Sequence, residues 1–171
     1  GRPDFRMEAI TKANGIEHTD AHDALADVRA TLDLARLIRS AQPKLFGFLL
    51  RMRDRKEAQK LINLESHEPI VHSDKSYTRP GGASTLVAPL TTDQENNRAV
   101  LVFDLRFDPS PFLRRSVDEL RSAAFTPRRE QPDDDQLPVS RVALNRVPSI
   151  APQNTLDDEA AERLGIDRRQ V

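Results

Sequence analysis

A histidine and an aspartate near the N-terminus have the residue types and spacing of half a metal-dependent nuclease site. His22 lies five residues before Asp27, at the start of a segment whose apolar spacing predicts a helix. Hydrolysis of a phosphodiester needs an activated water and neutralisation of charge at phosphorus, and two magnesium ions about 3.5 to 4 Å apart supply both. Magnesium prefers hard oxygen ligands, so Asp27 suits a metal ligand and His22 suits activation of the water. The positive end of the helix dipole would also attract phosphate.

The same segment supports other interpretations. A histidine five residues before an aspartate often arises by chance, so His22 could cap the helix while Asp27 is an exposed carboxylate. His22 and Asp23 are also adjacent, as in metal phosphohydrolases of the HD type, which need further histidine and aspartate ligands from other helices. His18 and Asp23 therefore compete for the same roles.

The other acidic residues of a two-metal site are not visible before this motif. No Asp-x-Glu pair on an apolar strand precedes His22. We therefore expect the chain to be part of a longer enzyme. Because Asp27 alone cannot hold two magnesium ions, we expect the chain by itself to be inactive.

Composition excludes several classes of protein. The 171 residues are 37% hydrophobic, enough for a modest core, and the formal net charge of −1 does not indicate nucleic-acid binding by bulk electrostatics. There is no cysteine, which excludes disulfides and thiolate metal sites and suits a reducing cytoplasm. No apolar run approaches the roughly 20 residues that span a bilayer. DNA contacts must come from local basic clusters, although charged helix faces are usually only solvated. The main cluster comprises Arg51, Arg53, Arg55 and Lys56.

Helical periodicity dominates the first part of the chain. Helical segments are expected over residues 5–14, 21–41 and 44–64. Gly15 should end the first in a left-handed cap. Thr19 or Asp20 should cap the second, and Pro43 should open the third.

Short strands and two further helices are expected in the second part. Segments rich in Val, Ile and Leu predict strands over residues 69–72, 85–90, 99–105 and 139–147. Ser116 and Glu119 have capping-box spacing before a helix that ends at residue 124. Thr155 with Asp158 should cap a last helix, which Gly165 ends. With so few strands, a compact barrel is expected rather than an open sheet.

These residues resemble the bacterial exodeoxyribonuclease I family, which digests single-stranded DNA from the 3′ end. The resemblance follows one order along the chain, through residues 5–6, 13–18, 21–28, 42–46, 69–72, 87–90, 95–96, 154–156 and 163–166. The family belongs to the DEDD class of 3′-to-5′ exonucleases, with four acidic metal ligands and a histidine base on a ribonuclease-H-like fold. Within that class the His-x-x-x-x-Asp element is the last motif.

The resemblance implies a fold of mixed α/β and β character in two parts. Residues 1–42 would be the C-terminal helical end of the ribonuclease-H-like exonuclease domain. Residues 43–171 would be a Src-homology-3-like domain, a small β-barrel with inserted helices. Within it we expect linker helices at 43–66, the barrel at about 67–150 and a terminal helix at 154–165.

The resemblance also implies roles for single residues. His22 would be the catalytic histidine and Asp27 the final ligand of the two magnesium ions. Arg6 resembles a position that contacts substrate near the active site, and Asn145 a DNA-contacting position of the second domain. Arg98 stands where better-known members carry asparagine, which would make that contact more electrostatic.

The partners implied are single-stranded DNA and, less strongly, the single-stranded DNA-binding protein. In the family an acidic tail of that protein enters a basic and polar pocket, where Glu68, Pro152 and Asp157 stand here. We expect the two carboxylates to weaken or rearrange tail binding. The resemblance further implies a monomeric, cytoplasmic and nucleoid-associated enzyme of DNA repair and recombination, without membrane contact, that releases 5′-mononucleotides. The alternative is a non-catalytic single-stranded nucleic-acid or partner-binding module.

One further expectation concerns the long helix of residues 21–41. Its apolar residues Leu25, Val28 and Leu32 should be exposed where the sheet of the exonuclease domain would cover them. That exposure should favour aggregation or fraying of residues 1–42.

Overall fold

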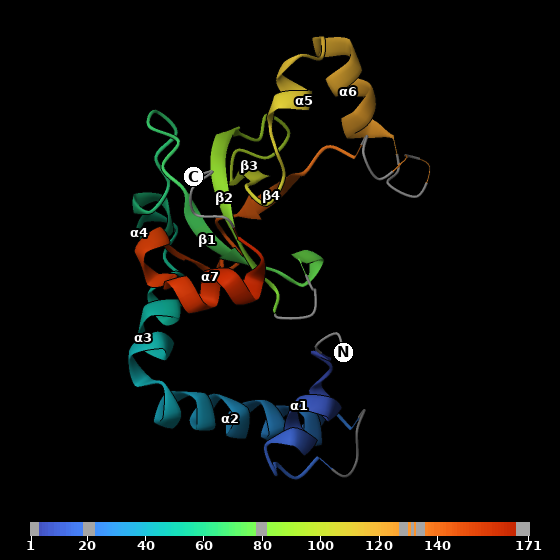
Figure 1. Ribbon diagram of the computed structural model, residues 1–171. Helices are drawn as coiled ribbons and strands as arrows, with labels where there is room; N and C mark the ends of the chain where they lie inside the picture. Colours follow the sequence, from blue (N-terminus) through green and yellow to red (C-terminus); the bar gives the residue numbers. More distant parts are fainter. Residues whose placement is uncertain are drawn as a thin grey trace.

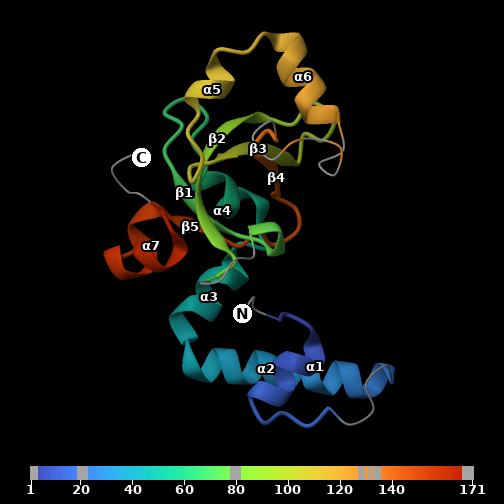
Figure 2. The same ribbon diagram turned by 45° about the vertical axis from the view of Figure 1, so that its right-hand side comes forward.

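A helical N-terminal part and a β-sheet unit make up the molecule. The computed structural model describes residues 4–18, 23–77, 82–126, 130, 132 and 136–166. The helices are α1 (Met7–Ala13), α2 (Ala24–Ala41), α3 (Pro43–Arg51), α4 (Arg55–Lys60), α5 (Ser110–Leu113), α6 (Val117–Phe125) and α7 (Asp158–Leu164). The strands are β1 (Ile70–Ser73), β2 (Ser84–Thr92), β3 (Ala99–Asp104), β4 (Val139–Ala143) and β5 (Ile150–Pro152). In Figures 1 and 2, α1 and α2 lie together at one end and α3 leads from them to the sheet.

Helix α1 ends in the left-handed turn that the sequence predicts. Gly15 has φ 65°, its N–H donates to the carbonyl of Lys12 at 3.3 Å, and the N–H of Ile16 donates to the carbonyl of Thr11 at 2.9 Å. These two bonds form a Schellman motif, which satisfies carbonyl groups at the helix end and reverses the chain. Glu17 and His18 therefore follow directly after a sharp turn.

Helix α2 is long, as expected, but its cap differs from the prediction. The carboxylate of Asp23 accepts a hydrogen bond from the N–H of Ala26 at 3.0 Å, so Asp23 is the cap residue. The capping prediction of Thr19 or Asp20 was wrong because the described helix begins at Ala24 and its cap is the residue immediately before. Thr19 and Asp20 lie outside the described residues.

The helical region predicted over residues 44–64 consists of two helices, α3 and α4. Helix α3 ends at Arg51, and Met52, its C-cap residue, is 3% exposed in the core. The carboxylate of Asp54 accepts from the N–H of Lys56 at 2.9 Å and starts α4. A short polar residue that caps a new helix competes with continuation of the old one, which sequence periodicity alone did not reveal.

Five strands form one antiparallel sheet in the order β4-β3-β2-β1-β5. The strand predicted over residues 139–147 ends at Ala143, and β5 is a strand that the sequence did not indicate. Because β4 and β5 lie at opposite edges, the connection between them crosses the end of the sheet. The hydroxyl of Tyr77, which follows β1, lies 2.6 Å from the Oγ of Ser140 on β4. This bond joins the turn after β1 to β4, a strand that does not pair with β1, consistent with a sheet curved towards a small barrel.

The two faces of the sheet carry separate apolar clusters, because successive strand side chains point to opposite faces. The larger cluster contains Met52, Ala58, Ile70, Tyr77, Val87, Val100, Val102, Val142, Leu144 and Ile150. The smaller cluster contains Leu86, Leu156, Ala161 and Ile166. Helix α4 therefore contributes to one face of the sheet and α7 to the other.

An insertion between β3 and β4 carries α5 and α6. Ser116 and Glu119 form the predicted capping box, in which each side chain binds the other residue's backbone N–H. Helix α5 was not predicted because it is only four residues long. Its Phe112 contacts Phe103 of β3 edge-on, with ring centroids 6.1 Å apart, and so anchors the insertion to the sheet.

Helix α7 ends as predicted but begins with a different cap. Gly165 adopts φ 69° and closes the helix. The cap is Asp157, whose carboxylate accepts from the N–H of Ala160 at 2.7 Å, so the predicted capping by Thr155 with Asp158 was wrong. Thr155 instead donates to the carbonyl of Pro152 at 2.7 Å, within the turn that follows β5.

Candidate functional site

Asp27 is held by a histidine that the sequence did not assign to it. The Nε2 of His18 lies 2.7 Å from Oδ1 of Asp27, with the histidine side chain 3% exposed and the aspartate side chain 48% exposed. A carboxylate only accepts hydrogen bonds, so Nε2 carries the hydrogen and donates it. The pair thus combines a fixed, buried donor with an acceptor that solvent can reach.

Two local structures bring this pair together. The Schellman turn at Gly15 reverses the chain after α1, so His18 meets α2 only a few residues later. Asp27 lies in the first turn of α2, where Asp23 caps the helix. The positive end of the helix dipole therefore lies close to the Asp27 carboxylate.

The described residues contain one candidate metal ligand of the predicted motif. His22 lies outside them, so its predicted catalytic role stays a prediction. No group of three or more histidine, cysteine, aspartate or glutamate side chains capable of holding a metal occurs within the described ranges. Asp23 binds the N–H of Ala26, and these ranges offer the HD interpretation none of the further ligands that it needs.

Arg98 and Asn145 occupy two turns that meet at one end of the sheet. The N–H of Leu144 donates to the carbonyl of Arg98 at 2.8 Å, which joins the turn before β3 to the turn after β4. Both side chains are exposed. The fold therefore brings together these two predicted substrate-binding residues, which are 47 positions apart in the sequence.

Arg6 lies elsewhere, at the N-terminus of α1. Its Nη2 is 2.6 Å from Oδ2 of Asp4, and its Nε donates to the same carboxylate. Hydrogen bonds from Arg6 lower the pKa of Asp4 to about 2. Both side chains are exposed, so this ion pair is screened by water and can open for another anion.

The predicted basic cluster does not form one continuous face. Arg51 belongs to α3, with its guanidinium 5.6 Å from the centre of the Phe48 ring. Arg55 belongs to α4 and donates to the carbonyl of Asn97 at 2.9 Å, one residue before Arg98. Arg55 therefore supports the turn that carries Arg98, a role visible only once α4 packs on the sheet.

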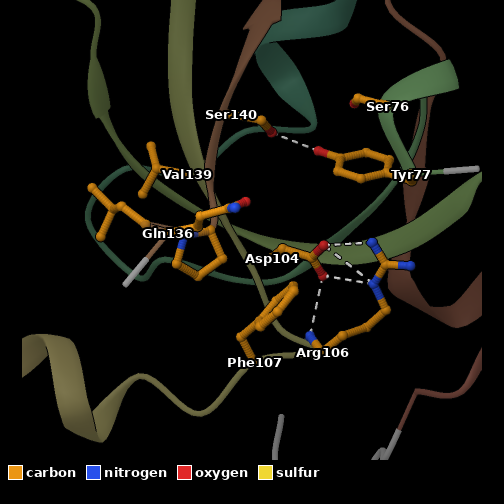
Figure 3. A pocket seen from close by; sticks show the side chains of 10 residues that line it. Ser76, Tyr77, Asp104, Arg106, Phe107, Gln136, Val139 and Ser140 are labelled. Carbon is orange, nitrogen blue, oxygen red and sulfur yellow. Dashed lines mark hydrogen bonds and ion pairs between the residues drawn. The ribbon is translucent and has the colours of Figure 1, made fainter. Parts of the chain in front are cut away.

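Figure 3 shows a cavity of about 340 Å³ that sequence reasoning missed. Its polar lining includes Ser76, Tyr77, Asp104, Arg106, Gln136 and Ser140. Arg106 donates through Nε and Nη2 to Asp104, and Thr85 donates to the same carboxylate at 2.8 Å. Both members of the ion pair are buried. The carboxylate is saturated with donors, so we interpret the pair as a structural anchor for the end of β3.

A second buried polar group adjoins this cavity. The Nδ1 of His72 lies 3.0 Å from the hydroxyl of Tyr77. Burial lowers the pKa of His72 and raises the pKa of Tyr77, because it disfavours the charged form of each. Both groups therefore stay neutral near pH 7 and link β1 to β4 through Ser140.

Residues 53–171 match the family described as the exonuclease I SH3-like domain. The chain belongs to this family. The fold predicted from the sequence, a Src-homology-3-like domain with added helices, is therefore confirmed. Among the described residues, no helix is long and apolar enough to cross a membrane.

Relatives of this exonuclease I family extend the match to the N-terminal helices. The chain is 42% identical over 169 residues to exodeoxyribonuclease I of Escherichia coli K12 and 43% identical over 171 residues to that of Haemophilus influenzae, covering 99% of this chain in each case. It spans 36% of the length of either relative.

Solved structures of E. coli exonuclease I have the same arrangement. The complex with a dA16 oligonucleotide superposes with a TM-score of 0.92 at 42% identity, over 99% of this chain and 36% of that one. A zinc-bound form of the complex of E. coli exonuclease I with single-stranded DNA superposes with a TM-score of 0.91 at 42% identity, over 98% and 36%.

Proposed function

We propose that this chain is part of a 3′-to-5′ exodeoxyribonuclease that hydrolyses single-stranded DNA to 5′-mononucleotides. One observation carries the proposal. In a chain 42% identical to E. coli exodeoxyribonuclease I over 99% of its length, a solvent-accessible carboxylate, Asp27, is held in place at the N-terminus of α2. A bacterial cytoplasmic enzyme of DNA repair and recombination is the setting that we infer for it.

In this proposal Asp27 is one of several carboxylate ligands for two magnesium ions, and His22 activates the attacking water. The metals, when bound, would supply charge neutralisation at phosphorus and a more acidic water. Asp27 has the hard oxygen atoms that magnesium prefers, and its exposure leaves room for an ion. The described residues supply this single ligand of the set. In the proposal, the remaining carboxylates come from a longer protein.

We place the boundary between the exonuclease domain and the SH3-like domain at residues 42 and 43. Helix α2 ends at Ala41, and Pro43 begins α3. In this proposal the adjoining turns of Arg98 and Asn145 are the part of the SH3-like domain that contacts DNA. A guanidinium at Arg98 can contact any phosphate, so its contribution to DNA binding should weaken as the salt concentration rises.

We also propose that this chain binds the acidic tail of the single-stranded DNA-binding protein weakly. Glu68 and Asp157 are exposed carboxylates that flank the paired strands β1 and β5, whose Ile70 and Pro152 are partners. An acidic peptide would meet like charge there, which disfavours association.

Fluorescence anisotropy with a labelled tail peptide and the longer protein tests this proposal. The Glu68→Lys variant should bind the peptide more tightly than the native protein, because it replaces repulsion by attraction. Glu159→Lys, which makes the same charge change on α7, is the matched control. Micromolar binding by the native protein would contradict the proposal.

Directional degradation tests the proposed activity. The longer protein that contains this chain should release 5′-mononucleotides in the presence of magnesium from single-stranded DNA labelled at its 3′ end, before a label at the 5′ end is lost. Binding of the DNA without release of nucleotides would favour the alternative of a non-catalytic binding module.

A further inference from the structure

His18 is an almost fully buried imidazole that uses one of its two nitrogens. Nε2 binds Asp27 at 2.7 Å, whereas Nδ1 is buried and has no hydrogen-bond partner among the described residues. A buried polar atom without a partner destabilises the folded state, because it has lost its hydrogen bonds to water. A side chain such as leucine would fill the same space without that cost, so the histidine needs a reason other than packing.

The backbone holds His18 in place before any side-chain bond forms. Gly15 takes a left-handed conformation, and the two hydrogen bonds of the Schellman motif fix the direction of the following residues. Thr11, whose carbonyl accepts from Ile16, is itself buried and bonds through Oγ1 to the carbonyl of Met7 at 2.9 Å. Hydrogen bonds therefore fix the backbone just before His18, the donor. The side chain of the acceptor, Asp27, is half exposed.

We infer that His18 is a positioning residue for Asp27: its Nε2–H holds Oδ1 and thereby fixes the rotamer of the carboxylate that the proposed function makes a metal ligand. The inference rests on that proposed function. The hydrogen bond selects one rotamer of the Asp27 carboxylate, so a metal ion does not have to select it on binding. A fixed donor removes that entropic cost before the metal binds.

Hydrogen bonds to metal ligands orient those ligands, so their loss weakens metal binding. Loss of such a partner usually lowers metal affinity or activity about 10- to 100-fold. The loss should appear in kcat and in the magnesium concentration needed for half-maximal binding. It should not appear in KM for single-stranded DNA, because the His18 side chain is buried and so is not available for contact with DNA.

Two near-isosteric variants of the longer enzyme separate positioning from packing. The amide nitrogen of a glutamine can replace Nε2–H, whereas that of an asparagine reaches only to the position of Nδ1. His18→Gln should therefore keep kcat and magnesium affinity within a few-fold of the native enzyme. His18→Asn should lose about 10- to 100-fold in both. Calorimetric titration with magnesium measures the affinity without turnover, and anisotropy with chelator present measures DNA binding.

The native enzyme gives an independent test that does not depend on the activity of a variant. In a long-range proton–nitrogen correlation spectrum of histidine-labelled protein at mildly alkaline pH, His18 should carry its hydrogen on Nε2. His18→Gln assigns the signal. A hydrogen on Nδ1 would overturn the inference, as would an asparagine variant that matches the native enzyme or a glutamine variant that is equally impaired.

These outcomes are distinct from failure of the proposed function. If the native enzyme shows no magnesium-dependent release of nucleotides, the proposed function fails and the inference fails with it. If the native enzyme cleaves DNA and the His18 variants behave alike, only the positioning role is lost.

Discussion

At the scale of single residues, a buried histidine couples the stability of the sheet to pH. Burial lowers the pKa of His72 below its ordinary value of 6.5, so the folded chain binds this proton less readily than the unfolded chain does. The stabilisation is complete above about pH 6.5 and is lost as pH falls through the pKa of the folded state. Unfolding free energy should therefore fall below pH 6.5, by at most about 1.4 kcal/mol per pH unit for one proton.

Urea unfolding from pH 7.5 to 5, followed by fluorescence of Tyr77, measures this effect. Tyr77 is the only tyrosine and the chain has no tryptophan. In the His72→Asn variant the slope against pH should be smaller, because the group that gains a proton on unfolding has been removed. Parallel slopes in the two proteins would contradict the assignment to His72.

Of the two residues that pair at the candidate site, the sequence predicted the role of Asp27 but not the bond from His18. Residue type and helix position indicated Asp27 directly. The sequence suggested His18 only as a competitor for the roles of His22. Its bond to Asp27 was not predicted, because it depends on a reversal of the chain between the two residues. The signal was present in Gly15, which predicted the left-handed cap, but a cap does not tell which side chain meets the next helix.

At the scale of elements, the cap of α7 makes a specific prediction. Asp157 accepts a hydrogen bond from the N–H of Ala160, so Asp157→Ala should destabilise α7 by about 1 kcal/mol. Asp157→Ser keeps a hydrogen-bond acceptor without the charge, so it should destabilise α7 by only about a few tenths of a kcal/mol. Hydrogen exchange of the α7 amides measures both variants. Equal losses would mean that charge, not capping, stabilises the helix start.

Element types were easier to predict than element ends. The sequence pattern predicted α1, α2 and strands β1 to β3, because apolar residues recur at helical spacing in the helices and are enriched in the strands. The division at Met52–Asp54 was missed because a tertiary contact, the burial of Met52, decides it. Strand β5 was missed because three residues are too short to show a period, and its pairing with β1 depends on the crossing from β4.

At the scale of the whole molecule, α2 exposes an apolar face. Leu25, Val28 and Leu32 are each at least half exposed, as the sequence predicted. An apolar stripe of this kind promotes association. The chain of 171 residues should therefore self-associate in sedimentation experiments, and a variant with Leu25→Glu, Val28→Lys and Leu32→Glu should sediment as a monomer.

A control triple variant changes the polar side of the same helix, with Arg29→Gln, Asp33→Asn and Arg36→Gln. It should associate as the native chain does. A native chain that remains monomeric at high concentration would show that the exposed stripe is not a contact surface.

In the proposed function Asp27 is a ligand of the metal ions at a nuclease site. The most direct measurement is magnesium-dependent release of mononucleotides from end-labelled single-stranded DNA by the longer enzyme, beside its Asp27→Ala and Asp33→Ala variants. Asp33 is an exposed aspartate on the same helix that pairs with Arg36. Asp27→Ala should abolish release while DNA binding is retained, and Asp33→Ala should cleave as the native enzyme does. Full activity in Asp27→Ala would contradict the proposed role of Asp27 as a metal ligand.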